Sequence, residues 1–326
     1  MFQHILVPLD GSPLAEEALP VAAQLARASG GMITLLQVVD ISYAYLSYGA
    51  MQPAITQEII DSSFSCARMY LDSLSRYPDL AGVSLKKQVA LGYAAAMILS
   101  EASEHLVDII VMSSHGYTGI KRWVLGSVAE KVVHHAPVPI LILRDKKTLF
   151  IQSNGEGTGG IRALVPLDSS ARSQDVIAPA LALVAALSSP GQGRLHFAQM
   201  VVASKERNEE ARAESLQSAR QNLQDVSMCI NEGLVANVDS DPGFKLTWSA
   251  SLARDIAEGI VHMAECGERS GDKSIIGPSD LIAMTTHGYS GIKKWAMGSI
   301  AERVLHATKL PLLLVRPADM VRKEHL

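Results

Sequence analysis

The chain has 326 residues, 48% of them hydrophobic and 19% charged, which is enough for two domains of about 150 residues each. The formal charge of −4 argues against a nucleic-acid partner. No apolar run reaches the roughly 20 residues of a membrane helix, so we expect no membrane partner. The three cysteines are scattered and no signal peptide pattern precedes the first apolar segment, so we expect a cytoplasmic protein.

Strand and helix patterns alternate along the first half of the chain. Apolar strands are expected at 3–9, 32–39, 83–90, 107–112 and 139–143, and helices at 14–28, 56–75, 94–105 and 127–135. Strands that are apolar on both faces and separated by helices indicate a parallel sheet covered on both sides. The second half repeats this order, with its third strand expected near 244–248.

The second half of the chain is a copy of the first. Residues 115–135 read HGYTGIKRWVLGSVAEKVVHH, and residues 287–307 read HGYSGIKKWAMGSIAERVLHA, with thirteen of 21 positions identical. The segments VPLDGS and VPLDSS near the start of each half match as well. A repeat of this length indicates a tandem duplication. We therefore expect one domain over 1–145, a linker over 146–160 and a second domain over 161–318.

The spacing between matched residues locates an insertion in the second copy. Ile98 and Ile260 are 162 positions apart, whereas His115 and His287 are 172 apart. Ten residues were therefore gained between these two points. The polar, glycine-containing stretch 265–280 is the expected site, and its composition predicts a long loop.

Two segments of each copy are expected at the carboxyl ends of the strands, where open parallel sheets bind ligands. One is the turn after the first strand, with Asp10 or Asp168. The other follows the fourth strand and runs to a Gly-Ser pair that opens a helix. A carboxylate in the turn could accept hydrogen bonds from ribose hydroxyls or an adenine amine. A helix N-terminus preceded by glycine favours an anion such as phosphate.

Each of these features also has a purely structural interpretation. The stretches from Ser127 to Glu130 and from Ser299 to Glu302 have the capping-box pattern, which by itself only starts a helix. An aspartate or a histidine after a strand is commonly a turn residue. Neither the P-loop motif nor the dinucleotide-binding glycine motif is present, and no acid pair or His/Cys cluster indicates catalysis. What favours a ligand site is that the features occur twice, in the same order.

These residues resemble the universal stress protein family in its tandem two-domain form. The resemblance covers about 1–145 and 160–318, and its most specific element is the nucleotide signature Gly-x-x-Gly, nine residues, then Gly followed by Ser or Thr. It implies two sheets of strand order 3-2-1-4-5, an adenine nucleotide alpha hydrolase-like fold, that pair through their final strands as an intrachain pseudo-dimer. A homodimer is a further assembly that the resemblance allows.

The resemblance also implies which residues bind adenine nucleotide, ATP or AMP, with or without Mg²⁺. In the first copy they are Pro8, Asp10, Val38, Met112, Ser113, His115, Gly116, Gly126 and Ser127. In the second copy they are Pro166, Asp168, Met200, Met284, Thr285, His287, Gly288, Gly298 and Ser299.

Both copies depart from the family signature at its first glycine. Ser113 stands there in one copy and Thr285 in the other. A side chain at this place narrows the approach of the ligand, although its hydroxyl could donate to a phosphate. Thr285 and Met200 are larger than their counterparts, so we expect the first domain to bind better.

The function expected from the resemblance is that of a stress-response or signalling module that binds adenine nucleotide, and whether it is also an enzyme stays open. A slow ATP hydrolase and a nucleotide-free scaffold are the alternatives, and His115 and Asp10 are the nearest candidates for a hydrolase.

Overall fold

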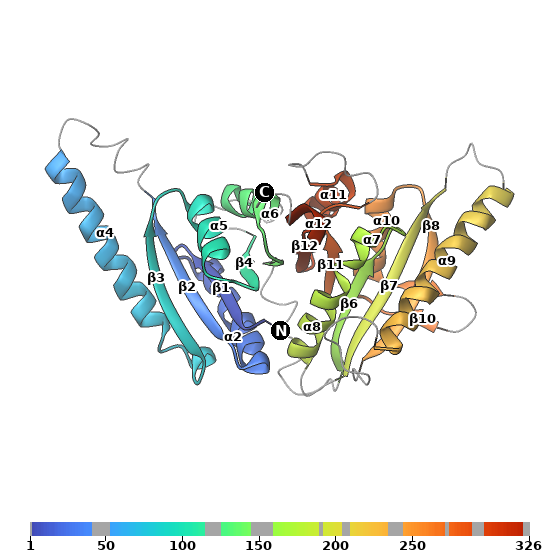
Figure 1. Ribbon diagram of the computed structural model, residues 1–326, viewed down its shortest axis with the longest axis horizontal. Coiled ribbons are helices and arrows are strands. Elements are labelled where there is room, and N and C mark those ends of the chain that lie inside the picture. The colour runs from blue at the N-terminus through green and yellow to red at the C-terminus, as the bar shows by residue number, and fades with distance from the viewer. Residues whose placement is uncertain are drawn as a thin grey trace. The chain divides into compact units, whose positions relative to one another are not determined.

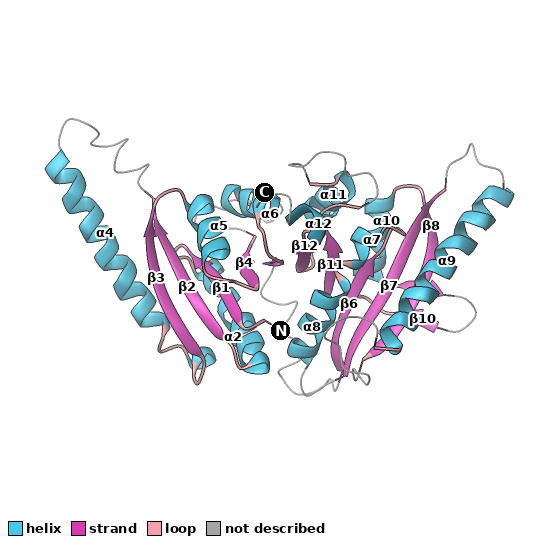
Figure 2. Cartoon of the chain, in the orientation of Figure 1, coloured by secondary structure: helices cyan, strands magenta, loops and turns pink. Residues whose placement is uncertain are grey.

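The computed structural model describes residues 2–40, 53–114, 125–144, 159–188, 192–203, 209–233, 244–270, 274–288 and 297–321. The chain divides into two compact units, Met1–Leu143 and Arg144–Leu326. Each unit is a parallel sheet with its helices (Figures 1 and 2). Most of the expected linker, residues 146–158, lies outside the described ranges. The first strand of the second unit begins at Gly159, two residues before the expected start of that domain.

The first unit contains a five-stranded sheet of order β3-β2-β1-β4-β5, with every neighbouring pair parallel. Its strands are β1 (His4–Leu9), β2 (Met32–Val39), β3 (Ser84–Leu91), β4 (Ile109–Ser113) and β5 (Ile140–Leu143). Its helices are α1 (Pro13–Glu16), α2 (Ala18–Ser29), α4 (Pro53–Leu74), α5 (Ala94–Glu104) and α6 (Ser127–His135), with a short 3₁₀ turn at Pro78–Leu80.

The second unit repeats this sheet as β8-β7-β6-β11-β12, again with every neighbouring pair parallel. Its strands are β6 (Gly159–Pro166), β7 (Gln192–Val202), β8 (Lys245–Ala253), β11 (Leu281–Thr285) and β12 (Leu312–Val315). Its helices are α7 (Ala171–Gln174), α8 (Ile177–Ser188), α9 (Glu209–Asn231), α10 (Ile256–Cys266), α11 (Ser299–Ala307) and α12 (Ala318–Val321). The expected tandem α/β fold is confirmed. The pairing of the units through β5 and β12 stays a prediction.

Helices cover both faces of each sheet because right-handed crossovers place them there. In the first unit, α2 and α4 connect β1 to β2 and β2 to β3, while α5 and α6 return the chain in the opposite direction and pack against each other. The central strands β1 and β4 are therefore buried on both faces, and β4 is buried along its whole length. This burial explains their continuous apolar sequence.

Two expectations about helices and loops were wrong. Instead of one helix over 14–28, the chain forms α1 and α2 with a break at Glu17, and the second unit has the same break before α8. The reason is Pro20, and Pro179 in the copy, because a proline ring clashes with the carbonyl four residues earlier. The insertion 265–280 is not all loop: β9 (Glu268–Ser270) and β10 (Ser274–Ile276) pair antiparallel within it.

The third strand of the second unit is longer than expected, because β8 runs to Ala253 and pairs with β7 along its full length.

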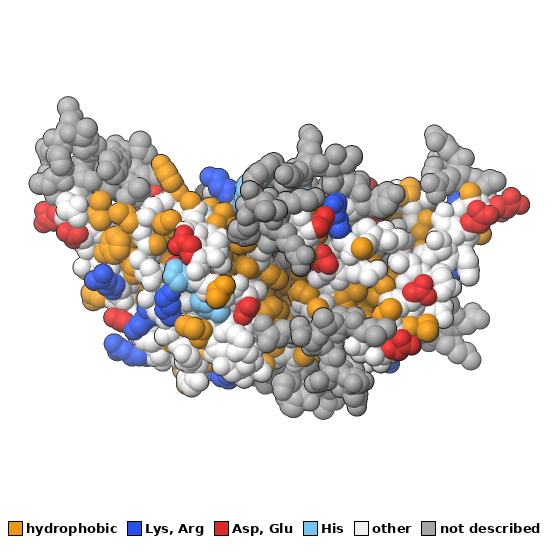
Figure 3. Space-filling model, in the orientation of Figure 1, with side chains coloured by type: hydrophobic (Ala, Val, Ile, Leu, Met, Phe, Trp, Pro, Cys, Tyr) orange, Lys and Arg blue, Asp and Glu red, His pale blue; other side chains and the backbone are white. Residues whose placement is uncertain are grey.

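No helix in the described ranges is long and apolar enough to cross a membrane. On the face seen in Figure 3, acidic, basic and hydrophobic side chains are interspersed over the described parts of both units, in keeping with the small net charge.

A buried histidine joins β7 to β8 in the second unit. His196 is 1% exposed, and its two ring nitrogens lie 2.9 Å from Thr247 Oγ1 and 3.0 Å from Ser249 Oγ. Burial, with a smaller contribution from the positive charge of Arg162, lowers the pKa of His196 to about 4. The ring is therefore neutral in the folded protein at pH 7, and both of its nitrogens form hydrogen bonds within the sheet.

We predict that this histidine makes the second unit lose stability in mild acid. The unfolded chain binds a proton at His196 below about pH 6.5, whereas the folded chain does so only below about pH 4. The free energy of unfolding therefore falls as the pH drops through this window, by up to about 3 kcal/mol. Urea unfolding of wild type and His196→Thr, measured between pH 7 and pH 4, should show a shallower loss in the variant. Threonine is the residue at the matching position 34 of the first unit. Parallel curves for the two proteins would contradict the prediction.

Candidate functional site

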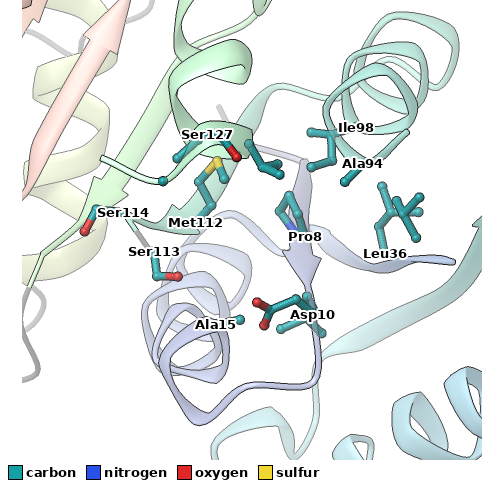
Figure 4. Close-up of a pocket in the computed structure, with 15 residues that line it drawn as sticks. Pro8, Asp10, Ala15, Leu36, Ala94, Ile98, Met112, Ser113, Ser114 and Ser127 are labelled. Atoms are coloured by element: carbon teal, nitrogen blue, oxygen red, sulfur yellow. The ribbon is translucent and has the colours of Figure 1, made fainter. Parts of the chain in front are cut away.

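One cavity of the first unit gathers the predicted site residues that the structure describes. Its volume is about 220 Å³. It lies where β1, β2 and β4 end and α6 begins (Figure 4). The predicted residues that line it are Pro8, Asp10, Val38, Met112, Ser113, Gly126 and Ser127. His115 and Gly116 lie outside the described residues. Their role stays a prediction.

Other residues line this cavity that the sequence analysis missed. Leu36 of β2 and Ala94 and Ile98 of α5 form an apolar wall, and Val128 and Ala129 extend the floor along the first turn of α6. A signal for the wall was available in the sequence. Leu36 is two residues from Val38 and so shares its face of the strand, and Ala94 and Ile98 are one helical turn apart.

The turn after β1 is held by a carboxylate that also faces the cavity. Asp10 Oδ1 accepts hydrogen bonds from Ser12 N (3.0 Å) and Ser12 Oγ (2.6 Å). Ser12 is in turn the N-cap of α1, and its Oγ accepts from Ala15 N at 3.2 Å. Figure 4 shows the carboxylate of Asp10 extending toward the hydroxyl of Ser113. One acidic side chain therefore fixes the turn and presents negative charge at the mouth of the cavity.

The second unit repeats this turn with different residues. Asp168 Oδ1 accepts from Ser170 N (3.0 Å) and Ser170 Oγ (2.5 Å), and Ser170 caps α7 by accepting from Ser173 N. The intervening residue needs a left-handed backbone in both copies: Gly11 has φ of +82° and Ser169 has φ of +66°. The sequence analysis singled out the aspartates but missed the serines that orient them.

The capping-box interpretation of the next element was wrong, although the helices begin where expected. The N-cap of α6 is Gly126 and that of α11 is Gly298, and neither helix has a side-chain cap. Gly126 N instead donates to Ser114 O, and Gly298 N to Thr286 O, both at 2.8 Å. The backbone thus ties each helix start directly to the end of a strand. The first-turn amides are left for a ligand or water rather than for a serine hydroxyl.

The cavity of the second unit is smaller, with a volume of about 100 Å³. Of the predicted residues, Pro166, Asp168, Met200, Met284, Thr285, Gly288, Gly298 and Ser299 line it. His287 is not among its lining residues. It is 5% exposed, and its Nδ1 lies 3.0 Å from Thr286 Oγ1. Buried in this way, His287 serves the conformation of the loop.

The departure from the signature at Thr285 has a structural role. Thr285 Oγ1 donates to His287 O at 3.0 Å, across the turn that follows β11. This hydroxyl is therefore used within its own loop and is not offered to a phosphate. The second glycine of the signature, Gly288, is needed for a different reason: a Cβ built on it would overlap Asp168 Oδ2.

We predict that Gly288→Ala destabilises the second unit through this overlap. The Asp168 carboxylate is held by Ser170 and cannot move aside without losing those hydrogen bonds, so a loss of about 1–3 kcal/mol is expected. In an Asp168→Ala background the same substitution should cost much less. A double-mutant cycle measured by urea unfolding tests this. Equal costs in both backgrounds would show that the carboxylate is not the obstacle.

A family model described as the universal stress protein family matches residues 1–144 and 278–316. A candidate universal stress protein of Staphylococcus haemolyticus is 30% identical over 148 residues, 45% of this chain and 87% of that protein. A universal stress protein of Methanocaldococcus jannaschii is 28% identical over 148 residues, 45% of this chain and 85% of that protein.

Solved structures cover nearly the whole chain at lower identity. A universal stress protein of Archaeoglobus fulgidus superposes with a TM-score of 0.62 and 17% identity, over 97% of this chain and 99% of that one. A structure of a candidate universal stress protein from Pseudomonas aeruginosa gives a TM-score of 0.59 and 15% identity, over 99% and 96% of the two chains. At such identities the likeness is one of fold, and it extends through both units.

Proposed function

The chain belongs to the universal stress protein family, and on that premise we propose that its first unit binds an adenine nucleotide, ATP or AMP, in the cavity at the carboxyl ends of β1, β2 and β4. The observation that carries the proposal is the combination of three surfaces in one cavity. These are an apolar wall, a carboxylate at the mouth and a helix start without a side-chain cap. Each surface suits a different part of a nucleotide.

The apolar wall suits the base. Pro8 and Val38 extend the wall formed by Leu36, Ala94 and Ile98, so the hydrophobic boundary comes from β1, β2 and α5. An adenine ring placed there would remove apolar surface from water, which is the main source of affinity in small-molecule sites. Asp10 at the edge of this wall can accept hydrogen bonds from the ribose hydroxyls or the adenine amine, because its orientation is already fixed by Ser12.

The start of α6 suits the phosphates. Gly126 has no side chain to cover the first-turn amides, and the positive end of the helix dipole favours an anion there. No group of three or more His, Cys, Asp or Glu that could hold a metal ion occurs in the described ranges. In this proposal Mg²⁺ would therefore accompany the phosphates of ATP rather than be held by the chain alone.

Two observations favour the first unit over the second. Its cavity is about 220 Å³, against about 100 Å³. The difference fits the side chains: Met200 occupies the place of Val38, and its sulfur and Cγ lie over Gly259 of α10. In the proposed role, nucleotide binding stabilises the folded first unit and so changes which partners or states are populated in a stress or signalling response in the cytoplasm.

We predict that Gly126→Val abolishes nucleotide binding and that Gly298→Val leaves it intact. A branched side chain at residue 126 covers the amides that would face the phosphates, whereas residue 298 belongs to the weaker site. Both glycines are N-caps, so the matched substitution imposes a similar cost on helix formation. Calorimetric titration of ATP and of AMP into the full chain measures the effect, and circular dichroism checks the fold. Loss of binding in Gly298→Val alone would reverse the ranking of the two sites.

A converse substitution should open the second site. Met200→Val removes the larger side chain at the position matched to Val38, so this variant is expected to bind a second equivalent of nucleotide, or to bind it more tightly. The reciprocal change, Val38→Met, should weaken the first site about tenfold, since a filled apolar pocket excludes the base. Binding stoichiometry from calorimetry decides between these outcomes and an unchanged single site, which would contradict the prediction.

A further inference from the structure

A second cavity in the first unit lies on the other side of β2 from the nucleotide cavity. Its volume is about 490 Å³, and it is an open cleft between the end of β2 and α4. Gln37 lines it from the strand, Ser62, Cys66 and Tyr70 line it from the helix, and Asp40 lies at its edge. Because successive residues of a strand point to opposite faces, Leu36 faces the nucleotide cavity while Gln37 faces this one.

An unsatisfied acceptor marks this cavity. The side-chain oxygen of Gln37, Oε1, is buried and has no hydrogen-bond partner within the described part of the chain. Buried polar atoms are nearly always paired, because leaving one unpaired costs its hydration without return. The Gln37 carbonyl therefore calls for a donor that the surrounding described residues do not supply.

The second unit shows what a satisfied version of this glutamine looks like. Gln199 occupies the position matched to Gln37 in β7. Asn222 of α9 donates its Nδ2 to Gln199 Oε1 at 2.9 Å, and Gln199 Nε2 donates to Ser169 Oγ at 2.6 Å. Both ends of the amide are thus paired within the unit.

Neither partner is conserved between the two copies. The segment Ser63-Phe-Ser-Cys-Ala67-Arg68 of α4 matches Ser215-Leu-Gln-Ser-Ala219-Arg220 of α9, which places Tyr70 opposite Asn222. Ala67 and Ala219 are both buried, in support of this match. Gly11 stands where the second unit has Ser169. The two residues that pair with Gln199 in the second unit, Asn222 and Ser169, are therefore replaced in the first unit by a tyrosine and a glycine.

Tyr70 does not serve Gln37, because its hydroxyl is used elsewhere. It donates to Glu16 Oε1 at 3.0 Å, and Tyr77 donates to Glu16 Oε2 at 2.6 Å. Burial raises the pKa of Tyr70, and the Glu16 carboxylate raises it further, so the phenol keeps the proton that it donates. The contact fixes α4 against α1, and the Gln37 carbonyl stays buried and unpaired within the described residues, in a side chain that lines the cavity.

The lining of this cavity is rich in acceptors and poor in cations. It includes the Asp40 carboxylate and the Gln37 carbonyl, and no lysine or arginine is among its described lining residues. We propose that this cavity is a second ligand site, which binds a small organic ammonium ion whose N–H group donates to Gln37 Oε1. An ammonium carries several donors and a positive charge, so it satisfies the buried carbonyl and is attracted by the acidic edge.

Putrescine, a four-carbon diammonium, is the probe, and 1,4-butanediol is its uncharged counterpart of the same length. Calorimetry on the full chain should show binding of putrescine, with the diol much weaker. Gln37→Leu should weaken putrescine binding at least about tenfold, the value of a hydrogen bond to a charged group. Gln37→Glu should tighten it, which a merely structural glutamine would not do. Gln199→Leu, the same chemical change in the second unit, should leave binding unchanged.

A closing variant and a second readout keep the test independent of folding. Tyr70→Asn introduces the residue of the second unit, which should pair with Gln37 and abolish putrescine binding. Cys66 and Cys229 are both exposed, but Cys66 lines this cavity and Cys229 does not, so bound putrescine should slow alkylation of Cys66 and not that of Cys229. Binding that persists in Gly126→Val would separate this site from the proposed nucleotide site. Absence of putrescine binding, equal binding in Gln37→Leu, or equal binding of the diol would each mean that the cavity holds only solvent and overturn the proposal.

Discussion

The candidate site depends on the parallel packing of β1 against β4. Ile5 and Leu6 pair with Ile109 and Ile110, so the two strands end at the same edge of the sheet. The turn with Asp10 and the residue after β4, Ser114, are thereby brought together although they are about 100 residues apart in the chain. The bond from Gly126 N to Ser114 O then fixes the helix start at that edge. The carboxylate and the helix start of the candidate site are placed by these few backbone pairings.

In the turn after β1 one side chain has two roles. The Asp10 carboxylate accepts hydrogen bonds from the N-cap residue Ser12 and also lines the cavity. Its orientation is therefore set before a ligand binds, which lowers the free-energy cost of binding. It also means that replacing Asp10 would disturb α1 together with the cavity, so that loss of binding alone could not assign its role. Ser12 and Ser170 are the residues through which this positioning acts, since they contact the carboxylate and lie outside the cavity lining.

Much of the fold follows from the sequence because it depends on patterns repeated within the chain. Apolar strands separated by helices, doubled by an internal match, determine the sheet class and the edge at which Asp10 and Gly126 meet. The sequence does not show the interactions that depend on a neighbour in space. Pro20 was a sequence signal for the break at Glu17, but the helical pattern over 14–28 looks continuous and predicted a single helix. The capping-box pattern at Ser127 does not cap the helix, because Gly126 occupies the N-cap position and its N donates to Ser114 O.

The two copies differ at two separate places, one on each face of the sheet. On one face of the sheet, Met200 of the second unit stands at the position matched to Val38 of the first, and the cavity of the second unit is the smaller one. On the opposite face, Asn222 and Ser169 pair with Gln199, whereas the matching Gln37 faces a cavity. At the matched glutamine, Gln199, the second unit pairs both ends of the amide with its own side chains. In the first unit the Gln37 side-chain oxygen has no partner within the described residues, although the sheet, strand order and helix starts are the same. A duplicated scaffold can therefore pair a buried group in one copy and leave the matching group unpaired in the other, and an unpaired group is one that a ligand can satisfy.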